Sequence, residues 1–217
     1  MQTVFITGGT GYIGTRLIKA LQQEGEFAIK ALIRKGSENK LPHGCEVIFG
    51  NALDASSYQN AIAPATIFVH LIGVAHPSPS KKEQFKNIDL VSVQQATKAA
   101  AGTGIQHFIY LSVAMHPTKV MKDFQQVRAQ GEALLLQQNF ITSFIQPWYV
   151  LGPGHWWPLL LKPVYFILKL FPSTRVTANN LDTVTIKQMI KALVISIKAQ
   201  PKENTVTDVQ MMKRLPA

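Results

Sequence analysis

The first fourteen residues carry the clearest chemical signal, because glycines recur there at a fixed spacing. Residues 7–14 read TGGTGYIG between a strand-like apolar run and an amphipathic helix-like run. Gly8 suits a tight turn, Gly11 lets the backbone approach a pyrophosphate, and Gly14 lets the helix pack closely on the strand. A helix N-terminus adds free N–H groups and the positive end of the helix dipole. The pattern predicts a dinucleotide phosphate site built from Thr7, Gly8, Thr10, Gly11, Tyr12, Ile13 and Gly14.

The end of the second predicted strand indicates which dinucleotide binds. NAD-binding proteins place a carboxylate about 20 residues after the glycines, where it binds the ribose 2′-hydroxyl. This chain has Arg34 there, followed by Lys35, and no acidic residue before Glu38. A guanidinium suits a 2′-phosphate through charge-assisted contacts. The sequence therefore favours NADP(H) over NAD(H), although an arginine solvated at a strand end would look the same.

The elements that must position this turn alternate along the chain. Unbroken apolar runs predict strands, and helical periodicity or turn signals separate them. We expect strands at residues 3–7, 27–34, 46–49, 66–72, 107–112 and 141–146, with a further late strand at 205–209. We expect helices at residues 12–23, 56–62, 83–102, 122–138 and 185–198. Strands joined by crossover helices imply a parallel sheet.

The predicted fold class is therefore α/β, a Rossmann doubly wound parallel sheet. Its 217 residues suit one domain. After Pro147 prolines and glycines become frequent and the periodic pattern weakens. We expect a single dinucleotide-binding domain over residues 1–217, in which residues 151–217 form a small C-terminal cap.

Composition excludes several classes of protein. The formal net charge of +10 comes from scattered residues, and no nucleic-acid motif accompanies it, so we expect no nucleic-acid partner. Cys45 is the single cysteine, which precludes an internal disulfide, and the chain opens on a strand rather than a secretory signal. These features favour a cytoplasmic location. Nothing in the sequence indicates an oligomeric state.

The apolar segment 156–171 has three interpretations. It could be a lid over an apolar substrate, an interfacial segment with Lys162 and Lys169 toward anionic headgroups, or ordinary packing of the cap or of a dimer. Prolines and lysines interrupt it, and it falls short of the ~20 residues that span a bilayer. We expect no transmembrane segment. Of the three interpretations the packed segment is favoured and the peripheral membrane contact is least favoured.

Further motifs extend the pattern of the glycine turn. They are the runs GNALD at 50–54, HLIG at 70–73, FIYLS at 108–112, RAQGE at 128–132 and QPWYV at 146–150. With the turn, they resemble the atypical and extended short-chain dehydrogenase/reductase superfamily. Within this superfamily the chain is similar to NAD-dependent epimerase/dehydratase-like proteins. More narrowly, it resembles NmrA-like proteins and the NAD(P)-binding relatives of a respiratory complex I accessory subunit. The resemblance covers residues 1–152 well and the remainder loosely.

That resemblance implies where the cofactor would lie. Asn51 and Ala52 would border the adenine, although the family usually has an aspartate at position 51. Residues 71–73, which are Leu71, Ile72 and Gly73, would border the adenosine ribose and the pyrophosphate. Residues 147–150, with Pro147 and Val150 at its ends, would lie by the nicotinamide.

The resemblance also locates the catalytic positions, and here the chain departs from the family. Active members use a Tyr-x-x-x-Lys pair on the helix after the fifth strand, with a serine at the end of that strand. In this chain Phe124 takes the tyrosine position and Arg128 the lysine position, while Ser112 remains at the serine position. Phenylalanine has no titratable proton. Arg128 keeps a cation that could bind the ribose, but it is no general base.

Three other side chains could supply the missing proton. Tyr149 follows the sixth strand near the expected nicotinamide position, His116 follows Ser112 after the fifth strand, and His155 lies in the loop after Tyr149. A packed tyrosine and two solvated loop histidines are the simpler interpretations. No histidines have metal-ligand spacing with a carboxylate, so we expect no metal site.

Two functions therefore stay open. One is an NADP(H)-dependent oxidoreductase or isomerase that acts on a small apolar carbonyl compound, with Ser112, Arg128 and Tyr149 as candidate catalytic residues. The other is a non-catalytic NADP(H)-binding redox sensor or assembly factor. The missing tyrosine favours the second hypothesis, whereas the retained serine and cation keep the first.

Overall fold

The fold is built around a seven-stranded parallel sheet. The structure is a computed structural model that describes residues 1–118 and 120–216. Strand order is β3-β2-β1-β4-β5-β6-β9, and every pairing is parallel. The strands are β1 Gln2–Thr7, β2 Phe27–Ile33, β3 Glu46–Phe49, β4 Ile67–His70, β5 His107–Leu111, β6 Ile141–Gln146 and β9 Thr205–Asp208. All seven predicted strands are present, and each ends within two residues of its expected bounds.

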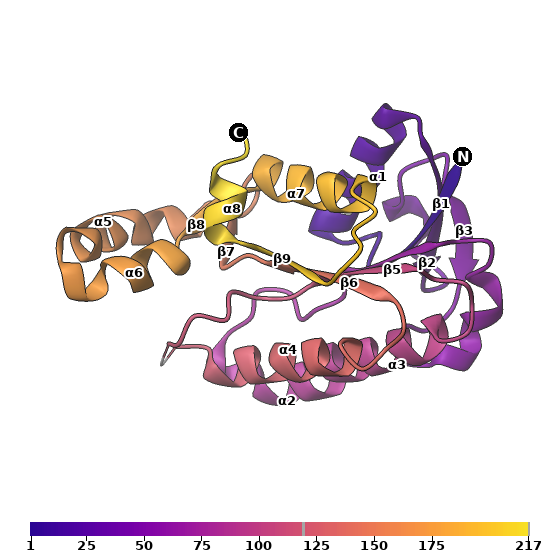
Figure 1. The fold of residues 1–217 in the computed structure, drawn as a ribbon, viewed down its shortest axis with the longest axis horizontal. Coiled ribbons are helices and arrows are strands. Elements are labelled where there is room, and N and C mark those ends of the chain that lie inside the picture. Colours follow the sequence, from indigo (N-terminus) through magenta and orange to yellow (C-terminus); the bar gives the residue numbers. More distant parts are fainter. Residues whose placement is uncertain (119, 217) are drawn as a thin grey trace.

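Helices cover both faces of this sheet (Figure 1). Helices α1 Tyr12–Glu24, α7 Ile186–Lys198 and α8 Val209–Lys213 lie on one side. On the other side lie α2 Lys82–Gln84, α3 Val91–Ala100 and α4 Lys122–Leu135. The predicted doubly wound Rossmann architecture is confirmed.

Alternation along the strands explains the two layers, since successive side chains point to opposite faces. In β1, Val4 and Ile6 pack with Leu17 of α1 and Leu193 of α7. Phe5 points the other way, into a second cluster under α3 and α4. Both clusters are buried, so both faces of the central strands are mainly apolar. The carboxyl ends of all seven strands meet at one edge, and order reverses between β1 and β4, where such folds bind ligands.

The predicted helix at 56–62 is wrong. Two 3-10 turns, Ala55–Ser57 and Gln59–Ala61, occupy the segment. Tyr58 between them has φ −146°, which is outside the helical region. Its ring is buried and stacks on Phe5, with ring centroids 5.9 Å apart. Tertiary packing of this tyrosine therefore overrides the local helical periodicity.

The predicted helix at 83–102 is present but irregular. Between α2 and α3 the residues Phe85–Leu90 form a π-helical segment. Such segments add a residue to a turn and are frequent at functional sites. Here the segment carries Asp89, whose side chain is fully buried.

The chain after Pro147 divides between the sheet and a projecting arm. Strands β7 Tyr149–Leu151 and β8 Thr183–Thr185 form a separate two-stranded parallel sheet. Helices α5 Lys162–Leu170 and α6 Pro172–Asn180 extend beyond the main sheet (Figure 1). Helix α7 then returns to cover α1, and β9 completes the sheet. Within the described residues 151–216, only the segment between β7 and β8 thus lies away from the Rossmann layers.

Most of the apolar segment 156–171 is left uncovered by the chain's own fold, so packing of the cap does not explain it, whereas packing in a dimer stays a prediction. No side chain of α5 is buried, and Leu160 just before it is 80% exposed. Within residues 1–118 and 120–216, no helix is long and apolar enough to cross a membrane.

Candidate functional site

The glycine turn connects β1 to α1 at the carboxyl edge of the sheet. Gly8 has φ +80°, a left-handed conformation that favours glycine, and its carbonyl accepts a hydrogen bond from Gly11 N at 3.0 Å. A Cβ on Gly14 would collide with Gly8 and lie 2.8 Å from the Cα of Gly9. Two of the three glycines are therefore required by the turn itself.

Gly11 differs from the other two because the protein leaves its side open. A Cβ there would meet only the Gly8 carbonyl oxygen, at 3.2 Å. Gly11 is also the N-cap of α1, without a side-chain cap. The first N–H groups of a helix have no partner within it, and with the helix dipole they attract anions. This open glycine at an uncapped helix N-terminus fits the pyrophosphate of a dinucleotide.

Further along the edge lie the residues expected around the adenosine. Arg34 follows β2 and is exposed, and no side-chain partner is present among the described residues. Asn51 follows β3, and its side-chain oxygen accepts a hydrogen bond from Leu53 N at 3.0 Å. Leu71 follows β4 against the turn, its backbone carbon 3.0 Å from a Cβ placed on Gly8. The structure thus brings the ends of β1 through β4 together at one edge.

Four side chains form a column beside the glycine turn, which the sequence did not reveal. The guanidinium carbon of Arg16 lies 3.9 Å from the ring centroid of Tyr12. The other neighbour of Tyr12 is His155, at 4.2 Å between ring centroids, and His76 stacks on His155 at 4.8 Å. Burial, His76 and Arg16 all lower the pKa of His155. His155 is thus a partly exposed loop residue that also stacks against Tyr12 and His76.

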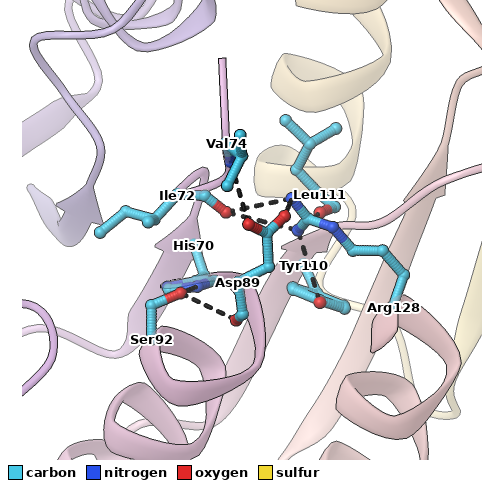
Figure 2. Close-up of polar contacts among 8 residues, drawn as sticks. All are labelled: His70, Ile72, Val74, Asp89, Ser92, Tyr110, Leu111 and Arg128. Carbon is cyan, nitrogen blue, oxygen red and sulfur yellow. Dashed lines mark hydrogen bonds and ion pairs between the residues drawn. The ribbon is translucent and has the colours of Figure 1, made fainter. Parts of the chain in front are cut away.

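Arg128 on α4 lies in a buried ion pair (Figure 2). Its Nη2 is 2.6 Å from Oδ1 of Asp89, and both side chains are at most 5% exposed. Nη1 donates to the carbonyl oxygen of Leu111 at 2.8 Å, and weaker bonds reach Ile72 O and the Tyr110 hydroxyl. The guanidinium thus joins the π-helical segment to the loop after β4 and to the last residue of β5.

Neighbouring backbone groups hold the Arg128–Asp89 ion pair in place. Asp89 also accepts a hydrogen bond from Val74 N at 3.0 Å. A Cβ on Gly73 would collide with Nη2 of Arg128, so a glycine is needed there for steric reasons alone. Burial raises the pKa of Asp89, and Arg128 opposes that shift. One donor remains, because the buried Nε of Arg128 has no hydrogen-bond partner among the described residues.

Phe124 lies one turn before Arg128 on the same face of α4. Its ring centroid is 5.2 Å from the guanidinium carbon of Arg128 and 4.9 Å from the ring of Phe85. The ring is half-buried and supplies neither a donor nor an acid. The position that the resemblance assigns to a catalytic phenol therefore holds an aromatic contact with the buried cation.

The side chain of Ser112 lies next to the carboxylate of Glu132, which is not among the predicted site residues. Its buried hydroxyl lies beside the Glu132 carboxylate, without a hydrogen bond of ordinary geometry. Glu132 accepts from Gln146 Nε2 at 2.8 Å, and burial raises its pKa. The spacing in the sequence could have indicated Glu132, since it follows Arg128 by one helical turn and so lies on the same face of the helix. Its proximity to Ser112 is decided by the packing of α4 on β5 and β6.

A small cavity of about 180 Å³ lies at the ends of β6 and β9 and is lined in part by His116, Gln146 and Asn180. Asn180 donates to Nδ1 of His116 at 3.2 Å, and Nε2 bonds to the hydroxyl of Thr177 at 2.9 Å. His116 is therefore anchored to α6, and its interpretation as a solvated residue is wrong. Tyr149 is half-buried beside Trp148, with ring centroids 5.5 Å apart, and burial raises its pKa.

Sequence comparison assigns the family. The profile of the NAD(P)H-binding family matches residues 8–143, from the glycine turn to β6. The chain belongs to this family. It is 26% identical to short-chain dehydrogenase/reductase family 42E member 1 of Xenopus laevis over 147 residues, which are 66% of this chain and 37% of that protein. The predicted membership of the dehydrogenase/reductase and epimerase-like superfamily is confirmed.

Two further similarities agree with this assignment. A 4-hydroxy-2-methyl-3-oxo-4-farnesyl-3,4-dihydroquinoline-1-oxide ketoreductase of Stigmatella aurantiaca is 23% identical over 68% of this chain and 50% of its own length. A short-chain dehydrogenase/reductase superfamily protein of Agrobacterium tumefaciens with bound NAD has TM-score 0.69 and 13% identity, covering 96% of this chain and 80% of that one. The latter shows the fold alone. This chain spans half or less of the two curated relatives.

Among the described residues, no group of three or more histidine, cysteine, aspartate or glutamate side chains could hold a metal ion.

Proposed function

We propose that this chain binds NADP(H) without performing the family's usual acid–base step on α4, and that it acts as a redox sensor or assembly factor. The observation that carries this proposal is the buried ion pair of Arg128 and Asp89. A cation engaged in this way cannot turn to a cofactor ribose unless the Asp89 carboxylate loses its partner. Leaving a buried charge unpaired is costly.

The neighbouring aromatic residue supports the same conclusion. Carbonyl reduction needs a proton as the hydride arrives, and a positioned acid contributes roughly 10²–10⁴-fold to such a step. Phe124 has no proton to give. Ser112 faces Glu132, so its hydroxyl is directed toward the interior between α4 and the sheet. The three positions of the usual catalytic set are thus all used for packing.

The choice of NADP(H) rests on Arg34. Its side chain is exposed and unpaired among the described residues, at the end of β2, next to the glycine turn. A 2′-phosphate would supply the missing partner. We further propose that the adenine lies by Asn51 and Ala52. The ribose and pyrophosphate would then lie by residues 71–73, and the nicotinamide by residues 147–150.

Calorimetric titration with NADPH and NADH tests the cofactor assignment. We expect wild type to bind NADPH more tightly, and Arg34→Asp to reverse the order. A charged bidentate contact contributes roughly 1.5–3 kcal/mol, or about ten- to a hundredfold in Kd. Lys40→Asp is the matched control, since Lys40 is exposed further along the chain. Equal affinities in wild type would reduce Arg34 to a surface residue.

Turnover tests the non-catalytic role. Oxidation of NADPH by wild type would be followed over a panel of aldehydes, ketones and quinones, with binding of NADPH confirmed in the same preparation. We expect rates indistinguishable from those without protein. Brisk turnover that survives both Phe124→Ala and Arg128→Lys would overturn the proposal, because chemistry would then be performed by other residues.

An oxidoreductase or isomerase acting on a small apolar carbonyl compound is the second candidate. The 180 Å³ cavity at the ends of β6 and β9 favours it, since residues 147–150, where the nicotinamide is expected, directly follow β6. One relative is named as a ketoreductase of a farnesyl-bearing quinoline compound, which has an apolar chain. Tyr149 would then be the first proton donor to test. Loss of turnover in Tyr149→Phe, with NADPH binding retained, would support this second role.

A further inference from the structure

The segment 156–180, here called the arm, presents an uncovered apolar surface. It comprises a 3-10 turn Trp157–Leu161 with α5 and α6, and it extends away from the main sheet (Figure 1). Eight of its apolar side chains are between 53% and 80% exposed, namely Trp156, Leu160, Val164, Phe166, Ile167, Leu170, Phe171 and Val176. Large apolar surfaces left open in this way mark interaction sites.

Helical spacing gathers the four of these side chains that belong to α5 on its outer side. Val164 and Ile167 are three residues apart, and Phe166 and Leu170 are four apart, so each pair shares a face. The inner side differs, because Tyr165 is half-buried against the core and Lys169 pairs with Asp182 at 2.5 Å. The outer side has no such partner among the described residues.

The charged side chains of the arm are all positive. No aspartate or glutamate occurs between Glu132 and Asp182, whereas the arm carries Lys162, Lys169 and Arg175. Lys162 and Arg175 are exposed. At the root of the arm a cavity of about 400 Å³ is lined by Lys162, Lys169 and Lys213, with Asp182 the only acidic residue in its lining. The arm therefore combines exposed apolar side chains with an uncompensated positive charge.

We propose that the arm docks on the surface of an anionic lipid bilayer. Its apolar side chains would enter the boundary between headgroups and acyl chains, and Lys162 and Arg175 would meet lipid phosphates. Helix α5 has nine residues and is about 14 Å long, so it can lie in the interface but not span the hydrocarbon core.

A second copy of the chain fits this surface less well. In a two-fold dimer the same patch meets itself, so the cations of two arms would approach one another. The arm has no carboxylate to pair with them. An anionic lipid surface supplies both the apolar layer and the missing negative charge.

Vesicle sedimentation tests the proposal with the full chain. The probes are phosphatidylcholine vesicles and mixed phosphatidylcholine–phosphatidylglycerol vesicles. We expect binding to the anionic vesicles to be about tenfold tighter or more, and to weaken as salt is raised. Equal binding to both vesicle types, or no retention on anionic vesicles at low salt, would overturn the proposal.

Matched variants assign the binding to the arm. Phe166→Ser with Leu170→Ser removes two exposed apolar side chains of α5, and Leu136→Ser with Ile195→Ser removes two that are similarly exposed elsewhere. Lys162→Glu is paired with Lys202→Glu, another exposed lysine. We expect at least a tenfold loss of vesicle binding for each arm variant, and little change for its control.

Two readouts keep the result interpretable. NADPH binding verifies that each variant is folded, because the arm lies outside the glycine turn. Light scattering reports the oligomeric state without lipid. A dimer that is lost in the Phe166→Ser and Leu170→Ser variant, together with no lipid binding by wild type, would assign the surface to a second copy and overturn the proposal. Equal loss of lipid binding in arm and control variants would overturn it as well.

Discussion

The turn after β1 and the inner face of α4 lie at the same edge of the sheet but use their polar groups differently. At the turn the backbone is kept open, with Gly11 uncrowded and the N-terminus of α1 uncapped. On α4 the polar groups are directed inward, where Arg128 bonds to Asp89 and to backbone carbonyl groups. The first region can accept an anion without breaking any internal bond, whereas the second must lose an ion pair to contact a ligand.

From this difference we predict which substitutions should lower ligand affinity and which should lower the free energy of unfolding. Changes at the open side of the turn should alter ligand affinity in a protein that still folds. Changes on the inner face of α4 should alter the fold before they alter any ligand contact.

Arg128→Ala should have the largest effect. It leaves the Asp89 carboxylate buried without its partner, which typically costs about 3–5 kcal/mol of stability. The free energy of unfolding, measured by urea denaturation, should fall by that amount. Arg175→Ala is the control, because Arg175 is exposed on α6. A stable Arg128→Ala protein that has lost only cofactor affinity would instead support a ribose contact.

His70 links the two regions and should make stability depend on pH. The Thr7 hydroxyl bonds to its Nδ1 at 2.8 Å. The Ser92 hydroxyl bonds to its Nε2 at 3.2 Å and donates onward to Asp89 O (Figure 2). Burial, with help from Arg128, lowers the pKa of His70 from 6.5 to about 3. Between these values the unfolded chain binds a proton that the folded protein excludes.

The contribution of His70 to the free energy of unfolding should therefore be fully present above about pH 6.5. It should decline as the pH falls toward 3. The slope for one such group approaches about 1.4 kcal/mol per pH unit. Burial lowers the pKa of His107 to about 4, which adds to the slope above that value. His70→Gln should remove its share of the slope between pH 6.5 and pH 5 in urea titrations, whereas His43→Gln, at an exposed position, should not. An unchanged slope in His70→Gln would mean that this imidazole is protonated in the fold.

The glycines of the turn should separate binding from stability. Gly14→Ala places a methyl group against Gly8 and Gly9, and overpacking of this kind costs about 1–3 kcal/mol. Gly11→Val places its side chain on the open side, so NADPH affinity should fall at least about tenfold while the melting temperature changes little. Calorimetry and thermal unfolding of both variants decide this. Full NADPH affinity in Gly11→Val would exclude the turn as the phosphate site.

Phe124→Tyr should have the smallest effect. The half-buried ring stays near Arg128 and Phe85, so unfolding free energy should change by less than about 1 kcal/mol. Because Arg128 remains paired with Asp89, we expect this variant alone to gain no turnover of NADPH with the carbonyl panel. A clear gain of NADPH turnover would show that the tyrosine hydroxyl was the only group that the catalytic site lacked.

Sequence patterns anticipated the backbone of this protein better than its side-chain contacts. Strands and the glycine turn depend on local periodicity and on conformations that glycine adopts easily, so they can be read from neighbouring residues. The helix predicted at 56–62 fails because burial of Tyr58 against Phe5 outweighs local preference. Glu132 beside Ser112 and the column from Arg16 to His76 join segments distant in the chain, which no local pattern encodes.

The sequence by itself determined the parallel sheet and the glycine turn, because each follows from residue types at fixed spacing, and the family resemblance implied that Phe124 and Arg128 replace the usual tyrosine and lysine. Only the tertiary structure decided what Arg128 does. Its partner Asp89 lies 39 residues earlier, on a π-helical segment that turns the carboxylate inward. The structure also decided that the apolar arm is uncovered. Periodicity can mark a side chain as apolar, but only the packing of the whole chain determines whether anything lies against it.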